Sequence, residues 1–268
     1  MKDLMKELGL TSKQVENILL SRKTKKNKPQ ILKRYMSDRE LRFGIVSDTH
    51  LCSTHEKLNE LHTFYHICKK MKVDTILHAG DMVAGWKVYR GQENEVHTFG
   101  AIGQSNYVIE NYPKVKGIKT YFITGNHCES FWKLAGIDIG DVIADKREDM
   151  IYLGMYDADV FLKGVHIKLH HGDGGGAYAL SYKGQKYAEQ IPSGKKPRVM
   201  IIGHFHTSFY FWYRNIHIIN AGCFEGQTTF LARKMLNPAI GGWIVDLRLG
   251  KKKNDVIACQ TGWIPFFE

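Results

Sequence analysis

The sequence predicts an α/β fold that contains two β-sheets. Apolar, β-rich runs at residues 41–47 and 75–77 flank a segment of helical periodicity, which makes a βαβ unit and favours a parallel first sheet. The later half changes to short alternating strands, beginning at residues 151–165, which indicates a second sheet. Polar residues close many of these runs, and strand ends in an α/β architecture gather along one edge of the sheet.

Length and composition fit one sizeable catalytic domain with a small N-terminal appendage, at 268 residues and 43% hydrophobic content. We expect residues 1–37 to form a helical hairpin followed by a basic linker, and residues 38–268 to form the catalytic domain. Residues 7–15 resemble the helix-turn-helix elements of DNA-binding proteins. A hairpin that docks on the catalytic domain or on a partner is the alternative.

The net charge of +11 and the isoelectric point near 9.3 favour a polyanionic partner, because a cationic surface releases condensed counterions from nucleic acid. No apolar stretch reaches the length of a membrane span, and the amino terminus lacks a signal-peptide core. The five cysteines are odd in number and scattered, which argues against a disulfide framework. We therefore expect a soluble cytoplasmic protein that binds nucleic acid and makes no membrane contact, in an oligomeric state left open.

Within the catalytic domain, residues 57–71 have the apolar spacing of a helix. The long segment that follows the strand at residues 75–77 begins beside polar residues, so we expect its first part, with Trp86 and Arg90, to line the substrate cleft. The alternative is that its aromatic side chains pack on the helix predicted near residues 99–112.

A glycine-rich loop at residues 172–176 follows a later apolar run. No Gly-Lys-Ser or Gly-Lys-Thr comes after it, which disfavours a nucleotide-binding P-loop. We expect this loop and Tyr178 to face the substrate, with a plain strand-to-helix connection as the alternative. Residues 208–220, 243–249 and 256–263 alternate like antiparallel strands and complete the predicted sheets.

Short polar motifs close five of the strand-like runs. The last motif carries two histidines one residue apart, so an extended backbone sends both imidazoles to the same side, past the carboxyl end of the strand. Neutral imidazole is the commonest protein metal ligand, and a glycine beside a ligand lets the backbone turn sharply. The motifs are, in order, Asp48-Thr49-His50, Gly80-Asp81, Gly125-Asn126-His127, His170-His171-Gly172 and Gly203-His204-Phe205-His206.

This ordered set resembles the calcineurin-like metallophosphoesterase family over residues 42–224. The resemblance implies a four-layer αββα sandwich of two mixed sheets flanked by helices, with a dinuclear metal site. It also implies that His127 steadies the phosphate and acts as the general acid. His171 is favoured over its neighbour His170 as a ligand, because the family's ligand directly precedes glycine. The implied metal ligands are Asp48, His50 and His206 for one ion, Asn126, His171 and His204 for the other, and Asp81 for both.

A dinuclear site of this kind predicts phosphoester hydrolysis. Two divalent ions about 3.5 to 4 Å apart activate water and hold the attacking and leaving oxygens of a displacement at phosphorus. Mixed carboxylate, amide and imidazole ligands suit Mn²⁺ first, with Fe, Zn or Ni as alternatives. We expect a phosphodiesterase or nuclease that acts on DNA or RNA. The alternatives are a small-molecule phosphatase or cyclic-nucleotide phosphodiesterase, and a scaffold that has lost its chemistry.

The sequence departs from the family pattern at two places. Cys128 stands where many relatives carry an acidic residue, and Glu129 beside it is expected to point elsewhere on an extended backbone. Residues 82–86 lack the Asp-Arg of related protein phosphatases and the His of the repair nucleases. Protein phosphatase activity is therefore disfavoured, close kinship to the repair nucleases is in doubt, and the group that orients His127 is left open.

Overall fold

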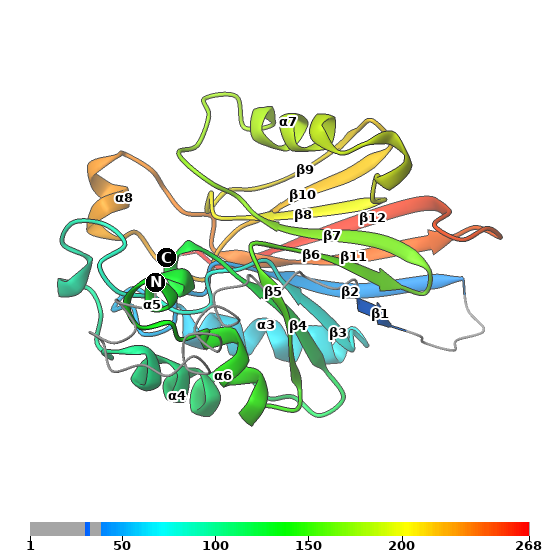
Figure 1. Ribbon diagram of the computed structural model, residues 1–268. Helices are drawn as coiled ribbons and strands as arrows, with labels where there is room; N and C mark the ends of the chain where they lie inside the picture. The colour runs from blue at the N-terminus through cyan, green and yellow to red at the C-terminus, as the bar shows by residue number, and fades with distance from the viewer. Residues whose placement is uncertain (1–29, 33–38, 268) are drawn as a thin grey trace, which may run out of the picture.

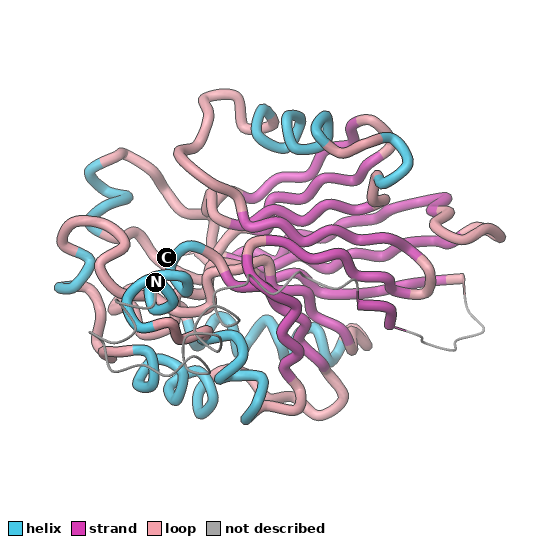
Figure 2. Tube along the Cα trace, in the orientation of Figure 1, coloured by secondary structure: helices cyan, strands magenta, loops and turns pink. Residues whose placement is uncertain are grey.

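Two six-stranded sheets lie face to face, with helices on the outer side of each (Figure 1, Figure 2). The computed structural model describes residues 30–32 and 39–267. The two facing sheets with helices outside them confirm the predicted four-layer αββα sandwich. The strands are β1 (Gln30–Leu32), β2 (Glu40–Val46), β3 (Thr75–His78), β4 (Lys119–Thr124), β5 (Met150–Met155), β6 (Asp157–Leu162), β7 (Val165–His171), β8 (Val199–Gly203), β9 (Ser208–Tyr213), β10 (Ile216–Ala221), β11 (Gly241–Leu249) and β12 (Val256–Pro265).

The first sheet has the strand order β12-β11-β2-β3-β4-β5, and the four strands from β2 to β5 are parallel. Its outer face is covered by four helices: α3 (Leu58–Lys70), α4 (Ala101–Asn111), α5 (Asn126–Ala135) and α6 (Ile139–Lys146). Helix α3 buries Leu61, Phe64, Tyr65 and Cys68, which recur at helical spacing and form its inward stripe. This helix is the crossover of the predicted βαβ unit.

The second sheet has the order β1-β6-β7-β8-β10-β9 and mixes parallel with antiparallel pairs. Helix α7 (Tyr182–Gln190) covers its outer face, where Ala188 packs against residues of β8 and β10. Between the sheets, Phe43 and Ile45 of β2 meet Val160 and Ile167 of the second sheet. All four side chains are fully buried. A short helix, α8 (Thr229–Arg233), follows β10 at the edge where the site lies.

Two segments differ from what the sequence predicts. Residues 150–155 form β5 of the first sheet rather than part of the second, because they pair in parallel with β4 after the crossover through α6. Three residues of the predicted N-terminal segment, Gln30–Leu32, form β1 and pair with β6. The predicted helical hairpin and most of the basic linker lie outside the described residues. No helix among the described residues is long and apolar enough to cross a membrane.

Candidate metal centre

The carboxyl ends of β2, β3, β4, β7 and β8 meet at one edge of the sandwich, and all five predicted motifs lie there. Five of the seven implied ligands turn the backbone themselves by adopting positive φ angles. Non-glycine residues rarely take this conformation, and it collects at functional sites, where the surrounding structure offsets its strain of order 1–3 kcal/mol. These residues are Asp48 (φ 49°), His50 (φ 41°), Asp81 (φ 52°), His204 (φ 81°) and His206 (φ 51°).

One group of ligand atoms is formed by Asp48, His50 and His206. The Nε2 atoms of His50 and His206 lie 3.1 Å apart, and Asp48 Oδ1 lies 3.7 Å from the first and 3.5 Å from the second. The Nδ1 atoms of both imidazoles are buried and have no hydrogen-bond partner among the described residues. Such orphaned polar atoms cost free energy, about 1–3 kcal/mol each. The two Nε2 atoms and the carboxylate oxygen that converge here form a donor set that fits a bound cation.

A second group is formed by Asp81, His171 and His204. Asp81 Oδ2 lies 3.1 Å from His171 Nε2, and Asn126 Oδ1 lies 3.2 Å from the same nitrogen and 3.0 Å from His204 Nδ1. The carboxylate of Asp81 also belongs to a third group with His50 and His127. It therefore lies between the two sets of ligand atoms.

Backbone carbonyls select which nitrogen of each imidazole in the second group is free. His171 Nδ1 donates to the carbonyl oxygen of Ala79 at 2.9 Å, and His204 Nε2 donates to that of Gly174 at 2.8 Å. A histidine that holds a metal commonly uses its other ring nitrogen in this way. The free nitrogens, Nε2 of His171 and Nδ1 of His204, are the two that face Asn126.

His170 and His171 project to opposite faces of β7. The alternating burial of this strand turns His171 into the centre, whereas the ring of His170 packs 4.5 Å from that of Tyr187 in α7. Two glycines that pack against the imidazole of His171 have no room for a side chain. A Cβ on Gly125 would lie 2.4 Å from this imidazole, and a Cβ on Gly80 would lie 2.3 Å from it. At Gly125 the need is thus close approach rather than a positive φ.

The buried carboxylates are ionised. Burial alone favours the neutral acid, but hydrogen bonds from His206 and His50 hold the pKa of Asp48 well below its usual range. The imidazoles of His171 and His127 likewise lower the pKa of Asp81 against its burial. Burial opposes a charge on His171, but Asp81 and Asp48 outweigh it and raise its pKa to about 9. Two buried anions ringed by imidazoles form a donor set that suits divalent transition metals.

The predicted general acid, His127, lies at the first turn of α5 and beside both groups. Its ring centroid is 4.3 Å from that of His50, and its backbone N–H donates to Asp81 Oδ1 at 2.9 Å. Its Nδ1 donates to the carbonyl oxygen of Ala84 at 2.6 Å, which leaves Nε2 free. Burial first, and then the neighbouring His50, lower the pKa of His127 to about 3. The imidazole is therefore neutral before an anion binds.

Sequence reasoning missed Gln92, the residue that supports the Ala84 carbonyl facing His127. Gln92 is buried, donates to the carbonyl oxygen of Ala84, and accepts from Val88 N at 2.8 Å. It fixes the segment that carries the carbonyl facing His127 Nδ1.

Glu129 lies in helix α5 rather than on the extended backbone that the sequence predicts, and it accepts from Tyr156 Oη at 2.7 Å.

A cavity of about 800 Å³ opens over the centre and reaches Asp81, Asn126, His127, His204 and His206. Gly174, Gly175 and Gly176 of the glycine-rich loop line it, together with Tyr178. The segment after Asp81 contributes Val88 and Tyr89 instead of the two residues that the sequence singles out.

Trp86 and Arg90 do not belong to the lining of this cavity. The ring of Trp86 packs edge-on against Phe99 at 5.3 Å, which is the alternative the sequence offers for it. Arg90 is exposed. Glu225 was missed, although it follows the strand end of β10 by a few residues. It is 5% exposed, lines the cavity, and places Oε2 3.9 Å from His50 Nε2.

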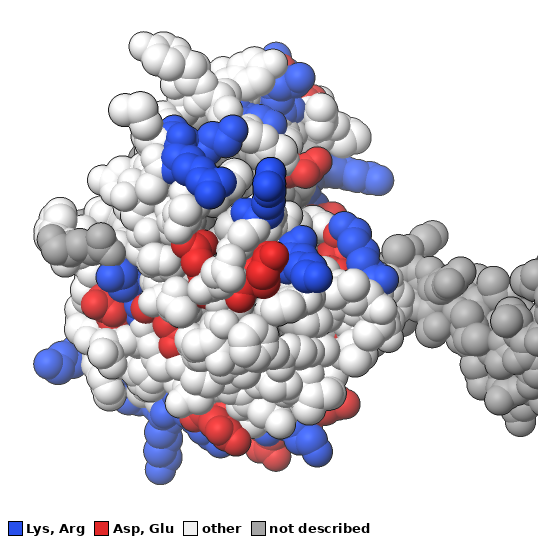
Figure 3. Space-filling model, turned by 90° about the vertical axis from the view of Figure 1, so that its left-hand side faces the viewer, with Lys and Arg blue, Asp and Glu red and all other residues white. Residues whose placement is uncertain are grey.

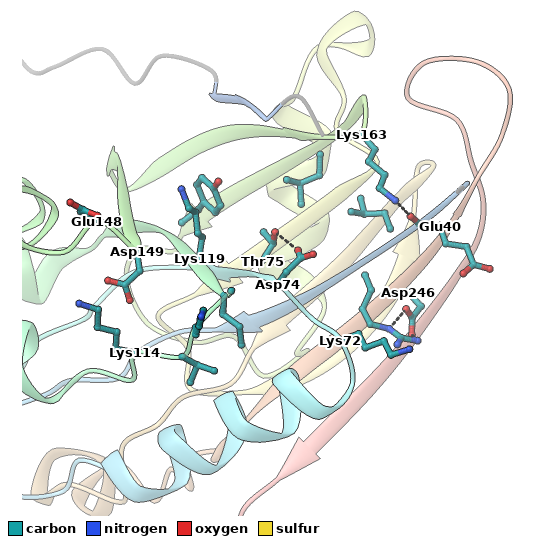
Figure 4. A pocket seen from close by; sticks show the side chains of 18 of the residues that line it. Glu40, Lys72, Asp74, Thr75, Lys114, Lys119, Glu148, Asp149, Lys163 and Asp246 are labelled. Carbon is teal, nitrogen blue, oxygen red and sulfur yellow. Dashed lines mark hydrogen bonds and ion pairs between the residues drawn. The ribbon is translucent and has the colours of Figure 1, made fainter. Parts of the chain in front are cut away.

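A larger cavity, of about 1210 Å³, lies at the opposite edge, where β2, β3 and β4 begin (Figure 4). Figure 4 shows lysines and acids dispersed around it. Arg42 Nε donates a hydrogen bond of 2.6 Å to Asp246 Oδ1. No imidazole lines this cavity among the described residues. Its charges do not converge on a point, so it is a weaker candidate for chemistry despite its size.

The chain is similar in sequence to known proteins. A sequence model of the calcineurin-like phosphoesterase superfamily domain matches residues 41–236. The DNA polymerase II small subunit of Halobacterium salinarum is 23% identical over 247 residues, which cover 76% of this chain and 47% of the relative. That of Methanothermobacter thermautotrophicus is 25% identical over 196 residues, which cover 61% and 41%. The chain therefore spans about half the length of the curated relatives it matches.

Solved structures with a similar fold include one described as a novel archaeal phosphodiesterase, with 17% identity and a TM-score of 0.48, covering 84% of this chain and all of that one. Vps29 of Entamoeba histolytica, complexed with Zn²⁺, has 11% identity and a TM-score of 0.41, covering 84% and 99%. The superfamily match spans most of the chain and contains every residue of the metal centre. The chain therefore belongs to the calcineurin-like phosphoesterase superfamily.

Proposed function

We propose that the protein hydrolyses phosphodiester bonds with two divalent metal ions, for which Mn²⁺ is the first choice. The observation that carries this proposal is the placement of Asp81 between two convergent groups of ligand atoms. Bound ions would activate water and stabilise the charge that develops on the phosphoryl oxygens. The ligands would be Asp48, His50 and His206 for one ion, and Asn126, His171 and His204 for the other, with Asp81 shared.

His127 serves as the general acid in this proposal. Its free Nε2 is the nitrogen that can carry the proton, because Nδ1 is committed to Ala84. The pKa of about 3 means that the bound phosphate must first favour the imidazolium. A negative phosphodiester beside the ring does so, since an opposite charge within a few ångströms stabilises the protonated form. Proton transfer from Nε2 then neutralises the leaving oxygen.

Nucleic acid is the substrate class that we favour. The net charge of +11 suits a polyanion, and basic side chains lie around the acidic ones on the face that carries the site (Figure 3). Lys183 and Lys234 line the cavity itself. The relatives named DNA polymerase II small subunits are proteins of DNA metabolism by name, which is consistent with this choice.

The test compares a methyl 4-nitrophenyl phosphodiester with 4-nitrophenyl phosphate, under Mn²⁺ and under a chelator. We expect Mn²⁺-dependent turnover that favours the diester, and two metal ions per chain by elemental analysis. Preference for the monoester would indicate a small-molecule phosphatase. A protein that binds no transition metal and hydrolyses neither ester would contradict the proposal and support a scaffold role.

A further inference from the structure

One wall of the cavity is aromatic and lies beside His127. The rings of Tyr89 and Phe230 pack 5.0 Å apart at an angle of 30°, and both line the cavity. The ring centroid of Tyr89 is 6.3 Å from that of His127. Phe230 keeps 41% of its surface exposed although it sits in a short helix over the site. An aromatic ring left open at this point has a free face for a planar ligand.

A buried carboxylate holds this wall in place. Glu95 is 8% exposed and accepts from the Tyr89 hydroxyl at 2.9 Å and from the backbone N–H of Thr229 at 2.8 Å. The imidazole of His55 lies 3.3 Å from the same carboxylate. Three segments that are distant in the sequence are thus joined by one side chain. Because Thr229 directly precedes Phe230, Glu95 fixes both rings relative to the metal centre.

The charge beside the wall selects the kind of planar ligand. Lys234 lines the cavity one helical turn after Phe230, and Lys183 lines it from the side of the glycine-rich loop. Aromatic rings interleaved with cations bind groups that combine a flat ring with an anionic backbone, as single-stranded nucleic acid does.

We propose that Tyr89 and Phe230 form a subsite for one nucleobase of the phosphodiester, on the leaving side of the scissile bond. The subsite rests on the proposed function for the position of the phosphate and for the acid role of His127. The leaving side follows from the contact between Tyr89 and His127, since the general acid faces the departing oxygen. Stacking binds any base, so this subsite requires a base but does not read its identity.

The test uses thymidylyl-thymidine and its two abasic forms, each of which lacks the thymine on one side of the phosphate. We expect Phe230→Leu to lower kcat/KM for the full dinucleotide by about tenfold, within the range for loss of one stacked base. The same variant should leave the rate unchanged for the abasic form that lacks the leaving-side base. Leucine keeps the apolar volume, so the fold is preserved.

Two further variants sharpen the result. Tyr89→Phe retains the ring but removes its hydrogen bond to Glu95. We therefore expect a smaller loss of kcat/KM than in Phe230→Leu, with the same dependence on the leaving-side base. Met235→Ala is the matched control, because Met235 is 92% exposed, lies close to Phe230 in the sequence and does not line the cavity. Equal losses on all three substrates would make the wall merely structural. Unchanged rates in every variant would assign the aromatic wall to a protein interface. Equal losses on all three substrates and unchanged rates in every variant would each overturn the subsite.

Failure of the proposed function is recognised separately. If the unmodified protein hydrolyses none of the dinucleotides, equilibrium binding of thymidine 5′-monophosphate is compared with that of deoxyribose 5-phosphate. Tighter binding of the nucleotide that is lost in Phe230→Leu would support the subsite while the hydrolytic proposal fails. Equal binding of the two ligands would overturn the subsite.

Discussion

The two edges of the first sheet both carry charged groups but use them differently. At the carboxyl edge, Asp48 and Asp81 are almost fully buried, and their oxygens converge with imidazole nitrogens within a few ångströms. At the amino edge, Arg42 and Asp246 pair with each other in contact with solvent. The amino edge has the larger cavity, at about 1210 Å³ against about 800 Å³. Convergence and burial of ligand atoms, rather than cavity volume, therefore mark the chemical site.

The largest expected effect comes from removing the charge of Asp81, the carboxylate that lies between the two groups of ligand atoms. Asp81→Asn keeps the shape of the side chain but removes its charge, so we expect loss of bound metal and a fall in kcat/KM of about a thousandfold, since a metal ion contributes several kcal/mol and 1.4 kcal/mol is tenfold. Elemental analysis and steady-state kinetics measure both effects. Asp246→Asn, at the other edge, is the matched control and should change neither. Full metal content with full activity in Asp81→Asn would remove the basis of the proposed centre.

The next effect in size separates proton transfer from metal binding. We expect His127→Ala to retain both metals and to lower kcat about a hundredfold on a phosphodiester with an alkyl leaving group, the low end of general acid catalysis. The loss should shrink on an activated aryl ester, whose leaving oxygen needs no proton. An equal loss on both esters would contradict the acid role and reduce His127 to a phosphate contact.

A smaller loss is expected when the support of His127 is removed. Gln92→Ala frees the segment around Ala84, and we expect kcat to fall about tenfold, as for hydrogen bonds that orient site residues, with KM unchanged. The dependence on the leaving group should follow that of His127→Ala. Gln104→Ala is the control, because Gln104 is also buried and bonds the adjacent Gly85 without contacting His127. The same pattern in both variants would show a general packing effect instead of positioning.

Sequence reasoning named the residues that converge at the carboxyl edge more completely than it named their surroundings. Predicted ligands such as His204 and His206 follow directly after an apolar strand, so the end of that strand brings them to the sheet edge. Both adopt positive φ angles, which the predicted extended backbone does not include. Gln92 and Glu225 lie in connections without periodicity, and only the path of the chain in space brings them to the centre. At the motif of His170 and His171 the sequence favours His171, and the alternation of β7 buries His171 at the centre.

The fold class was predictable, but the sheet to which each strand belongs was only partly so. Alternation marks residues 150–155 as a strand, yet it does not identify the partner, and the parallel pairing with β4 depends on the crossover through α6. Strand β11 likewise pairs with β2, although some two hundred residues separate them, and the salt bridge of Arg42 with Asp246 spans that pair. Local pattern specifies a strand, whereas tertiary packing selects its neighbours.

The amino edge should contribute to stability and leave catalysis unaffected. Arg147 is 3% exposed, and it donates to both carboxylate oxygens of Asp149 and to the carbonyl oxygens of Ile109, Tyr112 and Pro113. We expect Arg147→Met to lower the free energy of unfolding by about 3 kcal/mol, the low end for breaking a buried pair because Asp149 is partly exposed. Denaturant unfolding measures this loss, and kcat per folded molecule should stay unchanged.

The pH dependence of that loss identifies the ion pair as its source. Burial favours neutral Asp149, but its hydrogen bonds with Arg147 outweigh burial and lower its pKa. A carboxylate with a lowered folded-state pKa adds stability above its unfolded pKa of about 3.9 and loses it as the pH falls through the folded value. The stability difference between wild type and Arg147→Met should therefore narrow below about pH 4. A difference that stays constant with pH would attribute the loss to the three carbonyl contacts, which do not titrate.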